Sequence, residues 1–398
     1  MSLTPVLIAA LSGRALGASA RRAGFAPLIV DAFGDEDTRA GAKAYRGLPE
    51  ATRAGFRARA LIPALEALAA EAGTPPPGLV LGSGFEDTPK LVAALARRFP
   101  LLGNAGHVIA RAKDPAAFFP LLDTLGIPHP ETQTSPPAQP EGWLSKRIGG
   151  CGGGHVVAPS AAKSGAGRYY QRRLSGDPVS LLAVAQRDQL AIAGFSRQWT
   201  VGAEPRPNRY GGAVAPASLD AAAKDRMTAA AEAVGRALRL VGLVSFDFLL
   251  ADGVPYLLEV NPRPGATLDV LDDPSGALFT AHVAACRGEA VALPPLPAPG
   301  PRAAGILYAD RAALAPVVPE WPSWTADRPM PGTRIPRHRP VATVLAAGET
   351  AAAAELNCRR RLDELALMLY GRAPDTERDN AKTLRPRPER FGASSQAR

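Results

Sequence analysis

The 398-residue chain is poor in cysteine and in aromatic residues, and it contains no long apolar run. Its three cysteines, Cys151, Cys286 and Cys358, are too widely spaced for a disulfide framework or a zinc site. No segment approaches the roughly 20 apolar residues that span a bilayer, and no positive residue precedes the short apolar start, which we interpret as a buried strand and not as a secretory signal. We therefore expect a cytoplasmic protein with no membrane partner.

The charge is strongly positive, with a formal net charge of +9. Such an excess can serve nucleic-acid binding, but only 6% of residues are aromatic and no interleaving of basic and aromatic residues appears. Acidic small molecules account for the charge equally well, and we expect no nucleic-acid partner. The length exceeds one ordinary hydrophobic core, which predicts two or three domains.

Two apolar segments near residue 250 each carry one carboxylate, Asp247 and Glu259, and a short turn at 251–253 joins them. A hairpin would bring both carboxylates to one face, with Asn261 projecting the same way. These oxygens suit magnesium held jointly with substrate phosphates, and Arg263 adds a cation for a transferring phosphoryl group. The alternative is a solvated amphipathic hairpin; we disfavour it because apolar residues flank both carboxylates, and unpaired burial is costly.

The first hundred residues show the pattern of a doubly wound α/β sheet. Apolar strands and helical stretches are predicted at residues 6–10, 15–22, 27–31, 58–72 and 79–82. Because strand ends in such sheets face ligands, Gly13, Gly17 and the turn at 82–84 are weak candidates for a substrate crevice. Ordinary strand-to-helix turns explain each of them equally well, and no dinucleotide fingerprint follows the first strand.

A glycine-rich loop at 149–155 follows a predicted strand that contains Lys146. Five of its seven residues are glycine, which favours close approach of the backbone to phosphate, with Lys146 as a point charge on the same phosphates. A flexible linker is the alternative, since the loop has no Walker pattern. Cys151 and His155 lie in the loop without an evident orienting acid, and we assign them no catalytic role.

In the rest of the chain we predict a strand and turn at 169–178, further strands at 179–184 and 190–194, and a long Ala-rich helix at 221–240. Two short strands at 304–309 and 341–346 and a last helix at 350–369 follow. From residue 372 onward, charges and prolines with few apolar residues predict a disordered tail.

Taken in order, these features resemble the ATP-grasp superfamily over about residues 1–350. The Glu-x-Asn-x-Arg signature at Glu259, Asn261 and Arg263, after an acidic strand, carries most of the resemblance. It implies an α/β fold with a Rossmann-like N-terminal domain, a two-lobed ATP-grasp domain and a small C-terminal domain. The corresponding residues are 1–103, 104–290 with lobes at about 104–168 and 169–290, and 291–371, followed by the tail at 372–398.

The resemblance also implies a role for individual residues. ATP phosphates would be contacted by Lys113, Lys146, Gly149, Gly150, Gly152 and Gly153, and adenine would lie at a hinge formed by Gln171, Arg172 and Leu174. Asp247, Glu259 and Asn261 would bind two magnesium ions, with manganese as a substitute and Glu259 bridging the two. The catalytic residues would be Arg263, which steadies the γ-phosphate, and Lys146. Relatives often carry glutamate at the position of Gln171, and no ribose-binding acid is assigned.

The activity implied is that of an ADP-forming carboxylate-amine ligase, in which a carboxylate attacks the γ-phosphate of ATP and an amine then displaces phosphate. The segments 327–333 and 340–344 are more narrowly similar to the tyramine-glutamate ligase group of methanofuran and methylofuran biosynthesis, which implies glutamate ligation for a one-carbon cofactor and a homodimer. Two alternatives stay open: a small-molecule carboxylase acting through carboxyphosphate, and a nucleotide-binding regulatory protein that has lost catalysis.

Overall fold

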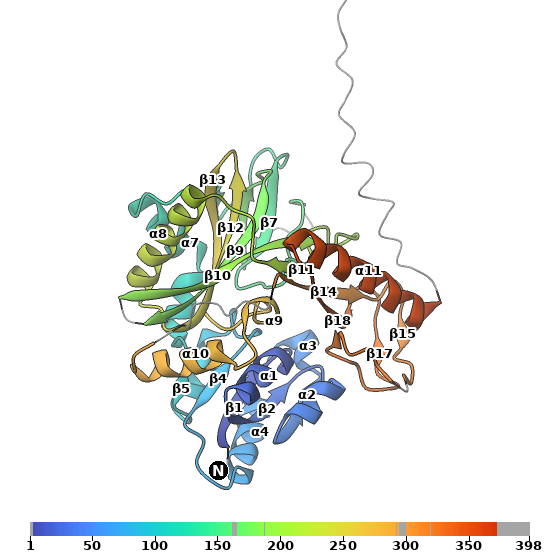
Figure 1. Cartoon of the computed structure of the whole chain (residues 1–398). Helices are drawn as coiled ribbons and strands as arrows, with labels where there is room; N and C mark the ends of the chain where they lie inside the picture. Colours follow the sequence, from blue (N-terminus) through green and yellow to red (C-terminus); the bar gives the residue numbers. More distant parts are fainter. Residues whose placement is uncertain are drawn as a thin grey trace, which may run out of the picture.

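The computed structural model describes residues 3–160, 165–186, 188–291, 293, 300–318 and 320–371 (Figure 1). The predicted tail at 372–398 lies outside the described residues. Among the described helices, none combines the length and apolar content needed to cross a membrane.

The N-terminal part is a five-stranded parallel sheet in the order β3-β2-β1-β4-β5. The strands are β1 (Thr4–Ala10), β2 (Phe25–Asp31), β3 (Ala44–Gly47), β4 (Leu79–Leu81) and β5 (Leu101–Leu102). Helices α1 (Arg14–Arg22), α2 (Glu36–Gly41), α3 (Ala51–Ala54), α4 (Ala58–Glu71) and α5 (Pro89–Ala96) connect them. The near-continuous apolar runs of β1 and β2 are buried, as expected for a sheet covered on both faces. The doubly wound α/β prediction for this part is confirmed.

A small antiparallel sheet, in the order β6-β8-β7, follows two helices. The helices are α6 (Gly106–Lys113) and α7 (Pro115–Thr124), and the strands are β6 (Thr132–Gln133), β7 (Trp143–Arg147) and β8 (Arg168–Arg172). Asp114 ends α6 and starts α7, because its side chain accepts a hydrogen bond from the backbone N–H of Ala116 at 3.0 Å. This cap places Lys113 at the end of α6.

The largest sheet has eight strands in the order β13-β12-β9-β10-β11-β14-β18-β16. Its strands are β9 (Asp177–Gln186), β10 (Gln189–Thr200), β11 (Tyr210–Ala215), β12 (Gly242–Ala251), β13 (Val254–Asn261), β14 (Arg302–Tyr308), β16 (Thr325–Ala326) and β18 (Pro340–Ala347). Helices α8 (Ala221–Leu238), α9 (Leu268–Leu271), α10 (Ala277–Arg287) and α11 (Ala351–Tyr370) pack on it, and β15 (Ala313–Leu314) pairs with β17 (Arg334–Ile335). Because β11 pairs directly with β14, the segment predicted as a separate C-terminal domain continues the central sheet. The domain boundaries at 103, 290 and 371 stay a prediction.

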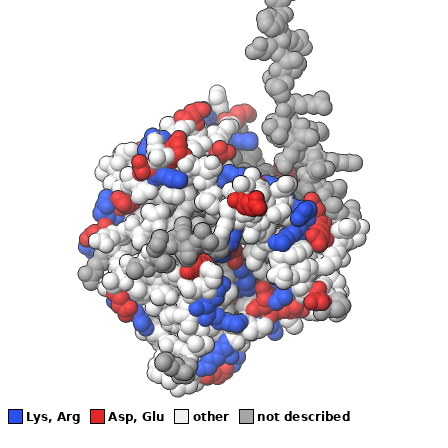
Figure 2. All heavy atoms as spheres, viewed as in Figure 1, with Lys and Arg blue, Asp and Glu red and all other residues white. Residues whose placement is uncertain are grey.

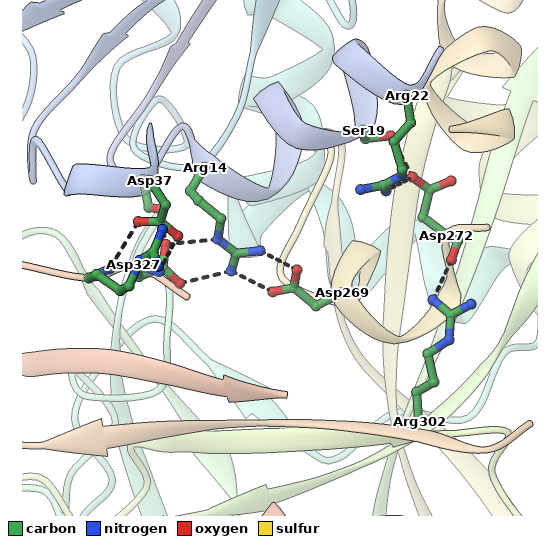
Figure 3. Close-up of polar contacts among 10 residues, drawn as sticks. Arg14, Ser19, Arg22, Asp37, Asp269, Asp272, Arg302 and Asp327 are labelled. Atoms are coloured by element: carbon green, nitrogen blue, oxygen red, sulfur yellow. Dashed lines mark hydrogen bonds and ion pairs between the residues drawn. The ribbon is translucent and has the colours of Figure 1, made fainter. Parts of the chain in front are cut away.

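Polar contacts from α1 join the N-terminal part to the other two (Figure 3). The Arg14 guanidinium binds Asp269 of α9 and, at 2.8 Å, Asp327 from the segment after β16. Nearby, Ser19 donates a hydrogen bond to Asp272 at 2.6 Å. The Arg14 side chain is 11% exposed, so this cation is shielded from water and fixes the relative placement of the three parts.

Candidate active site

The hairpin predicted near residue 250 is formed by β12, β13 and the two-residue turn Asp252-Gly253. Both turn residues have positive φ, 48° and 74°, the geometry that an Asp-Gly pair favours. The strand register contains a bulge: Phe248 pairs with Leu257, whereas Asp247 pairs with Glu259. Leu258 is the extra residue, and it brings Glu259 directly opposite Asp247.

The bulge decides which face Glu259 occupies. In an uninterrupted register Asp247 would face Leu258, and Glu259 would lie on the opposite face of the sheet because side chains alternate along a strand. With the bulge, the next pairs place Ser245 opposite Asn261. The structure therefore brings Asp247, Glu259 and Asn261 together on one face.

These three side chains form one hydrogen-bonded group. The Asn261 amide donates to Asp247 Oδ2 at 2.8 Å and to Glu259 Oε1 at 3.4 Å, and Ser180 Oγ donates to Asp247 Oδ1 at 2.6 Å. In the described part of the chain, no three His, Cys, Asp or Glu side chains gather as a metal site; the third oxygen donor here is an amide. An oxygen-only set of two carboxylates and one amide fits magnesium, which takes further ligands from water and phosphate.

Lys113 lies against the same oxygens. Its ammonium is 3.1 Å from Glu259 Oε2 and 2.8 Å from Asn261 Oδ1, so a cation is already stabilised at this position. Burial alone would raise the pKa of Glu259, but the ammonium groups of Lys113 and Lys146 hold it below its usual value. Burial and the negative charge of Glu259 raise the pKa of Asp247. Added positive charge at this face would favour the ionised form of both carboxylates.

Lys146, on β7, and Gln171, on β8, face each other across the small sheet. The Lys146 ammonium donates to Gln171 Oε1 at 2.5 Å, and the Gln171 amide donates to Thr132 Oγ1 at 3.1 Å. Burial and the charge of Lys113 lower the pKa of Lys146. A glutamate at position 171 would neutralise the charge of Lys146. The neutral side chain of Gln171 orients the Lys146 ammonium by a hydrogen bond and leaves its positive charge available to an anion.

The glycine-rich loop packs closely at two points. At Gly149 (φ +67°) a Cβ would lie 2.7 Å from Asp87 Cα, and at Gly153 (φ +68°) a Cβ would lie 2.0 Å from the backbone oxygen of Asn208. Only glycine fits both positions. Burial raises the pKa of Cys151 to about 11, so its thiol is protonated at neutral pH and is a poor nucleophile. Burial lowers the pKa of His155 to about 4.

Arg263 is held by an acid from the N-terminal part. Its Nε donates to Glu86 Oε1 at 2.8 Å, while Glu86 Oε2 accepts from the N–H groups of Gly84 and Phe85 at 2.7 and 2.9 Å. The Glu86 side chain is 3% exposed. No role is assigned to Glu86 from the sequence, because no local pattern pairs it with a residue 177 positions later, as the structure does.

A cavity of about 1500 Å³ joins most of these residues. Of the predicted site residues, its walls include Lys146, Gly152, Gly153, Gln171, Arg172, Leu174, Asp247, Glu259, Asn261 and Arg263. Lys113, Gly149 and Gly150 are not among the lining residues: Lys113 lies behind Glu259 and Asn261, Gly149 against Asp87, and Gly150 against the His155 ring. Such a volume holds a nucleotide and leaves room for a second small molecule.

Part of the chain is similar in sequence to known ATP-grasp proteins. Residues 112–267 match the family model of the ATP-grasp domain, and this range contains the hairpin, the glycine-rich loop and Lys113. Over 238 residues the chain is 25% identical to the carbamoyl phosphate synthase large chain of Myxococcus xanthus, a match that covers 53% of this chain and 22% of that protein. The chain thus spans about a fifth of the length of this curated relative.

Two solved structures resemble the whole molecule. Phosphoribosylamine–glycine ligase from Thermotoga maritima has a TM-score of 0.67 at 18% identity, covering 93% of this chain and 98% of that one. The biotin carboxylase domain of 2-oxoglutarate carboxylase from Hydrogenobacter thermophilus, in complex with MgADP, ADP and bicarbonate, has a TM-score of 0.67 at 12% identity, covering 90% and 89%. The fold is therefore the ATP-grasp fold, with a parallel N-terminal sheet and an antiparallel ATP-grasp region, as expected from the sequence.

Proposed function

We propose that this protein is an ATP-dependent carboxylate-amine ligase, which forms an amide through an acyl phosphate and releases ADP and phosphate. The observation that carries the proposal is the bulged hairpin, which sets Asp247, Glu259 and Asn261 on one face of a large cavity. Lys113 and Lys146 approach the same face, and Arg263 lines the cavity beside it. Converging carboxylates and cations of this kind suit phosphoryl transfer, where the protein mainly positions reactants and neutralises charge.

Each side chain has a task in this reaction. Magnesium ions held by Asp247, Glu259 and Asn261, two in our proposal with manganese as a substitute, would supply positive charge to the phosphates. Lys146 would bind phosphate oxygens from the cavity wall, and the same task for Lys113 requires its side chain to move from behind Glu259 and Asn261 into the cavity. Arg263, oriented by Glu86, would donate hydrogen bonds to the transferring group. The glycine-rich loop from Gly149 would cover the phosphates and keep water from the acyl phosphate.

Adenine is assigned to the hinge at Gln171, Arg172 and Leu174, which line the cavity beside the small sheet. The finer proposal is glutamate ligation in the biosynthesis of a one-carbon cofactor such as methylofuran, by a homodimer. It is supported by the similarity of segments 327–333 and 340–344 to the tyramine-glutamate ligase group. In the structure, residues of both segments line the same cavity as the hairpin.

A second candidate is carboxylation of a small molecule through carboxyphosphate. It is favoured by the likeness to the biotin carboxylase domain crystallised with MgADP and bicarbonate. The two activities are separated by the co-substrate: a carboxylase requires bicarbonate, and a ligase requires an organic carboxylate and an amine. A regulatory protein without catalysis would bind ATP and consume none.

The test is ADP release with magnesium and ATP across a panel of carboxylates, including glutamate, each with and without amines such as tyramine, and with or without bicarbonate. Release that needs both a carboxylate and an amine, with an amide product by mass, supports the ligase. Glu259→Gln and Asn261→Ala should abolish this release with the fold intact. The matched control is Glu349→Gln, at an exposed position outside the cavity. Normal ADP release by both site variants would remove the assignment.

A further inference from the structure

Five arginines from three distant segments gather at or next to the wall of the cavity, and we refer to them as the arginine cluster. Arg53 comes from α3, Arg206 and Arg209 from the segment between β10 and β11, and Arg337 and Arg339 from the segment between β17 and β18. Arg53, Arg206, Arg337 and Arg339 line the cavity that also contains the hairpin carboxylates. Figure 2 shows Lys and Arg side chains below the middle of the viewed face, with Asp and Glu side chains beside them.

The members of the cluster are close enough to affect one another. The positive charges of Arg206 and Arg53 add to burial in lowering the pKa of Arg339, and Arg206 likewise lowers the pKa of the buried Arg209. Arg339 donates a hydrogen bond to the backbone oxygen of Thr52 at 2.8 Å. Arg209 stacks on the ring of Tyr308 at 3.6 Å. Backbone and ring contacts thus hold two of these cations in place.

No direct ion pair within the described ranges offsets this charge. Throughout the described ranges, none of the five arginines takes part in an ion pair. Gathering like charges without counter-ions is unfavourable unless a ligand supplies negative charge. The arrangement resembles a binding site for an anion more than a structural ion-pair network.

The cluster adjoins the glycine-rich loop. A Cβ at Gly154 would lie 3.5 Å from the Cδ of Arg206. On the same segment, the Asn208 side chain donates to the backbone oxygen of Val156 at 3.0 Å, and the Tyr210 N–H donates to that of Gly152 at 3.0 Å. The segment that carries Arg206 therefore packs on the loop assigned to the ATP phosphates, which puts the cluster beside the nucleotide.

We propose that the arginine cluster binds the anionic group, phosphate or carboxylate, of a substrate that occupies the cavity next to ATP. This rests on the proposed function and narrows its substrate class to molecules with a negatively charged group remote from the reacting carboxylate. Guanidinium groups present paired N–H donors that match both phosphate and carboxylate oxygens. Arg206 and Arg337 are the members to test, because both line the cavity and both place a positive charge near His338.

The experiment measures anion binding by calorimetry with MgADP at saturation, so that the nucleotide site is filled. The probes are inorganic phosphate in one arm and glutamate in the other. The double variant Arg206→Gln/Arg337→Gln removes two cavity cations. Its matched control, Arg57→Gln/Arg59→Gln, removes two exposed cations outside the cavity. We expect affinity for at least one probe to fall about tenfold or more in the cluster variant, and to stay unchanged in the control.

Loss in the phosphate arm alone assigns a phosphate-bearing substrate, and loss in the glutamate arm alone assigns a carboxylate. Equal weakening in the cluster variant and the control, unchanged affinity in both, or no anion binding by the natural protein overturns the proposal. Nucleotide affinity and ADP release are recorded separately. Cluster-dependent anion binding without any ATP consumption would remove the ligase and leave the anion site standing.

Discussion

Glu86→Gln tests whether the N-terminal part organises Arg263, the arginine that we propose to be catalytic. The carboxylate of Glu86 is buried and bound to Arg263 Nε at 2.8 Å, with two backbone N–H donors on its other oxygen. Glutamine keeps the volume, removes the negative charge and turns one acceptor into a donor. Because Arg263 is only 15% exposed, it would be left as a poorly compensated buried cation. Breaking a buried pair in this way costs about 3–5 kcal/mol of unfolding free energy.

The stability lost in Glu86→Gln should depend on pH in a defined direction. Burial alone would raise the pKa of Glu86, but the positive charges of Arg263 and Lys113 hold it below its usual value. The carboxylate of Glu86 therefore binds a proton more readily in the unfolded chain than in the folded protein. The pair of Glu86 and Arg263 stabilises the fold fully above about pH 4.5, and this stabilisation is lost as pH falls through the folded-state pKa of Glu86. The difference between Glu86→Gln and the natural protein should be full at pH 7 and shrink toward pH 3.5.

Urea unfolding at both pH values measures the effect, with Glu66→Gln as the control. Glu66 pairs with Arg98 at 2.9 Å, but both side chains are about half exposed, so this change should cost at most about 1 kcal/mol. ADP release by Glu86→Gln should also slow about tenfold, since Arg263 loses the contact that orients it. Equal stability of Glu86→Gln and Glu66→Gln at pH 7 would show that the buried pair of Glu86 and Arg263 is no stronger than the exposed pair of Glu66 and Arg98.

Three further predictions concern charge and shape around the cavity. Burial and neighbouring aspartates raise the pKa of Asp35 to about 9, so folding becomes less favourable as pH rises from about 4 to 9. Asp35→Asn should therefore raise the free energy of unfolding by at least about 2 kcal/mol at pH 8 and change it little at pH 4, as measured by urea titration. Arg14→Met should cost about 3–5 kcal/mol because it strands two shielded aspartates, while Arg21→Met, at an exposed position, should be near neutral by the same measurement. Gly153→Ala should raise the KM for ATP far more than Gly152→Ala: both have positive φ, but only the first places a Cβ against backbone; equal effects would contradict the close-packing argument.

The sequence pattern predicted the elements of the site better than their geometry. The Asp-Gly turn and the apolar strands on either side are local features, and the hairpin formed where they indicated. The bulge is not local in this sense. Glu259 lies one residue further from the turn than Asp247 does. The two carboxylates can therefore share a face only if β13 contains one extra, unpaired residue, and this difference in spacing is the signal that the sequence offers. Alternation alone gives no reason for Leu258 to be that residue.

Long-range pairing accounts for what sequence reasoning missed. The proline-rich stretch after residue 290 predicts a domain boundary, which stays a prediction, but it gives no sign that β14 hydrogen bonds to β11 and continues the central sheet. Likewise, Glu86 and Arg263 are adjacent only because the turn after β4 and the turn after β13 meet in space. Single-sequence patterns report burial and turns, whereas such contacts depend on which strand edges pair, and no composition or spacing encodes that choice.

The N-terminal part therefore does more than add a wall to the cavity. Glu86 binds and orients Arg263, and Arg53 contributes a further cation to the wall of the same cavity. Both depend on the same placement, which Arg14 fixes through buried ion pairs to the central and C-terminal parts (Figure 3). A shift of the N-terminal part would disturb the proposed phosphoryl transfer and the proposed anion binding together. Variants of Arg14 should consequently impair both readouts, whereas variants confined to the arginine cluster should spare nucleotide binding, because the residues assigned to the nucleotide come from other elements.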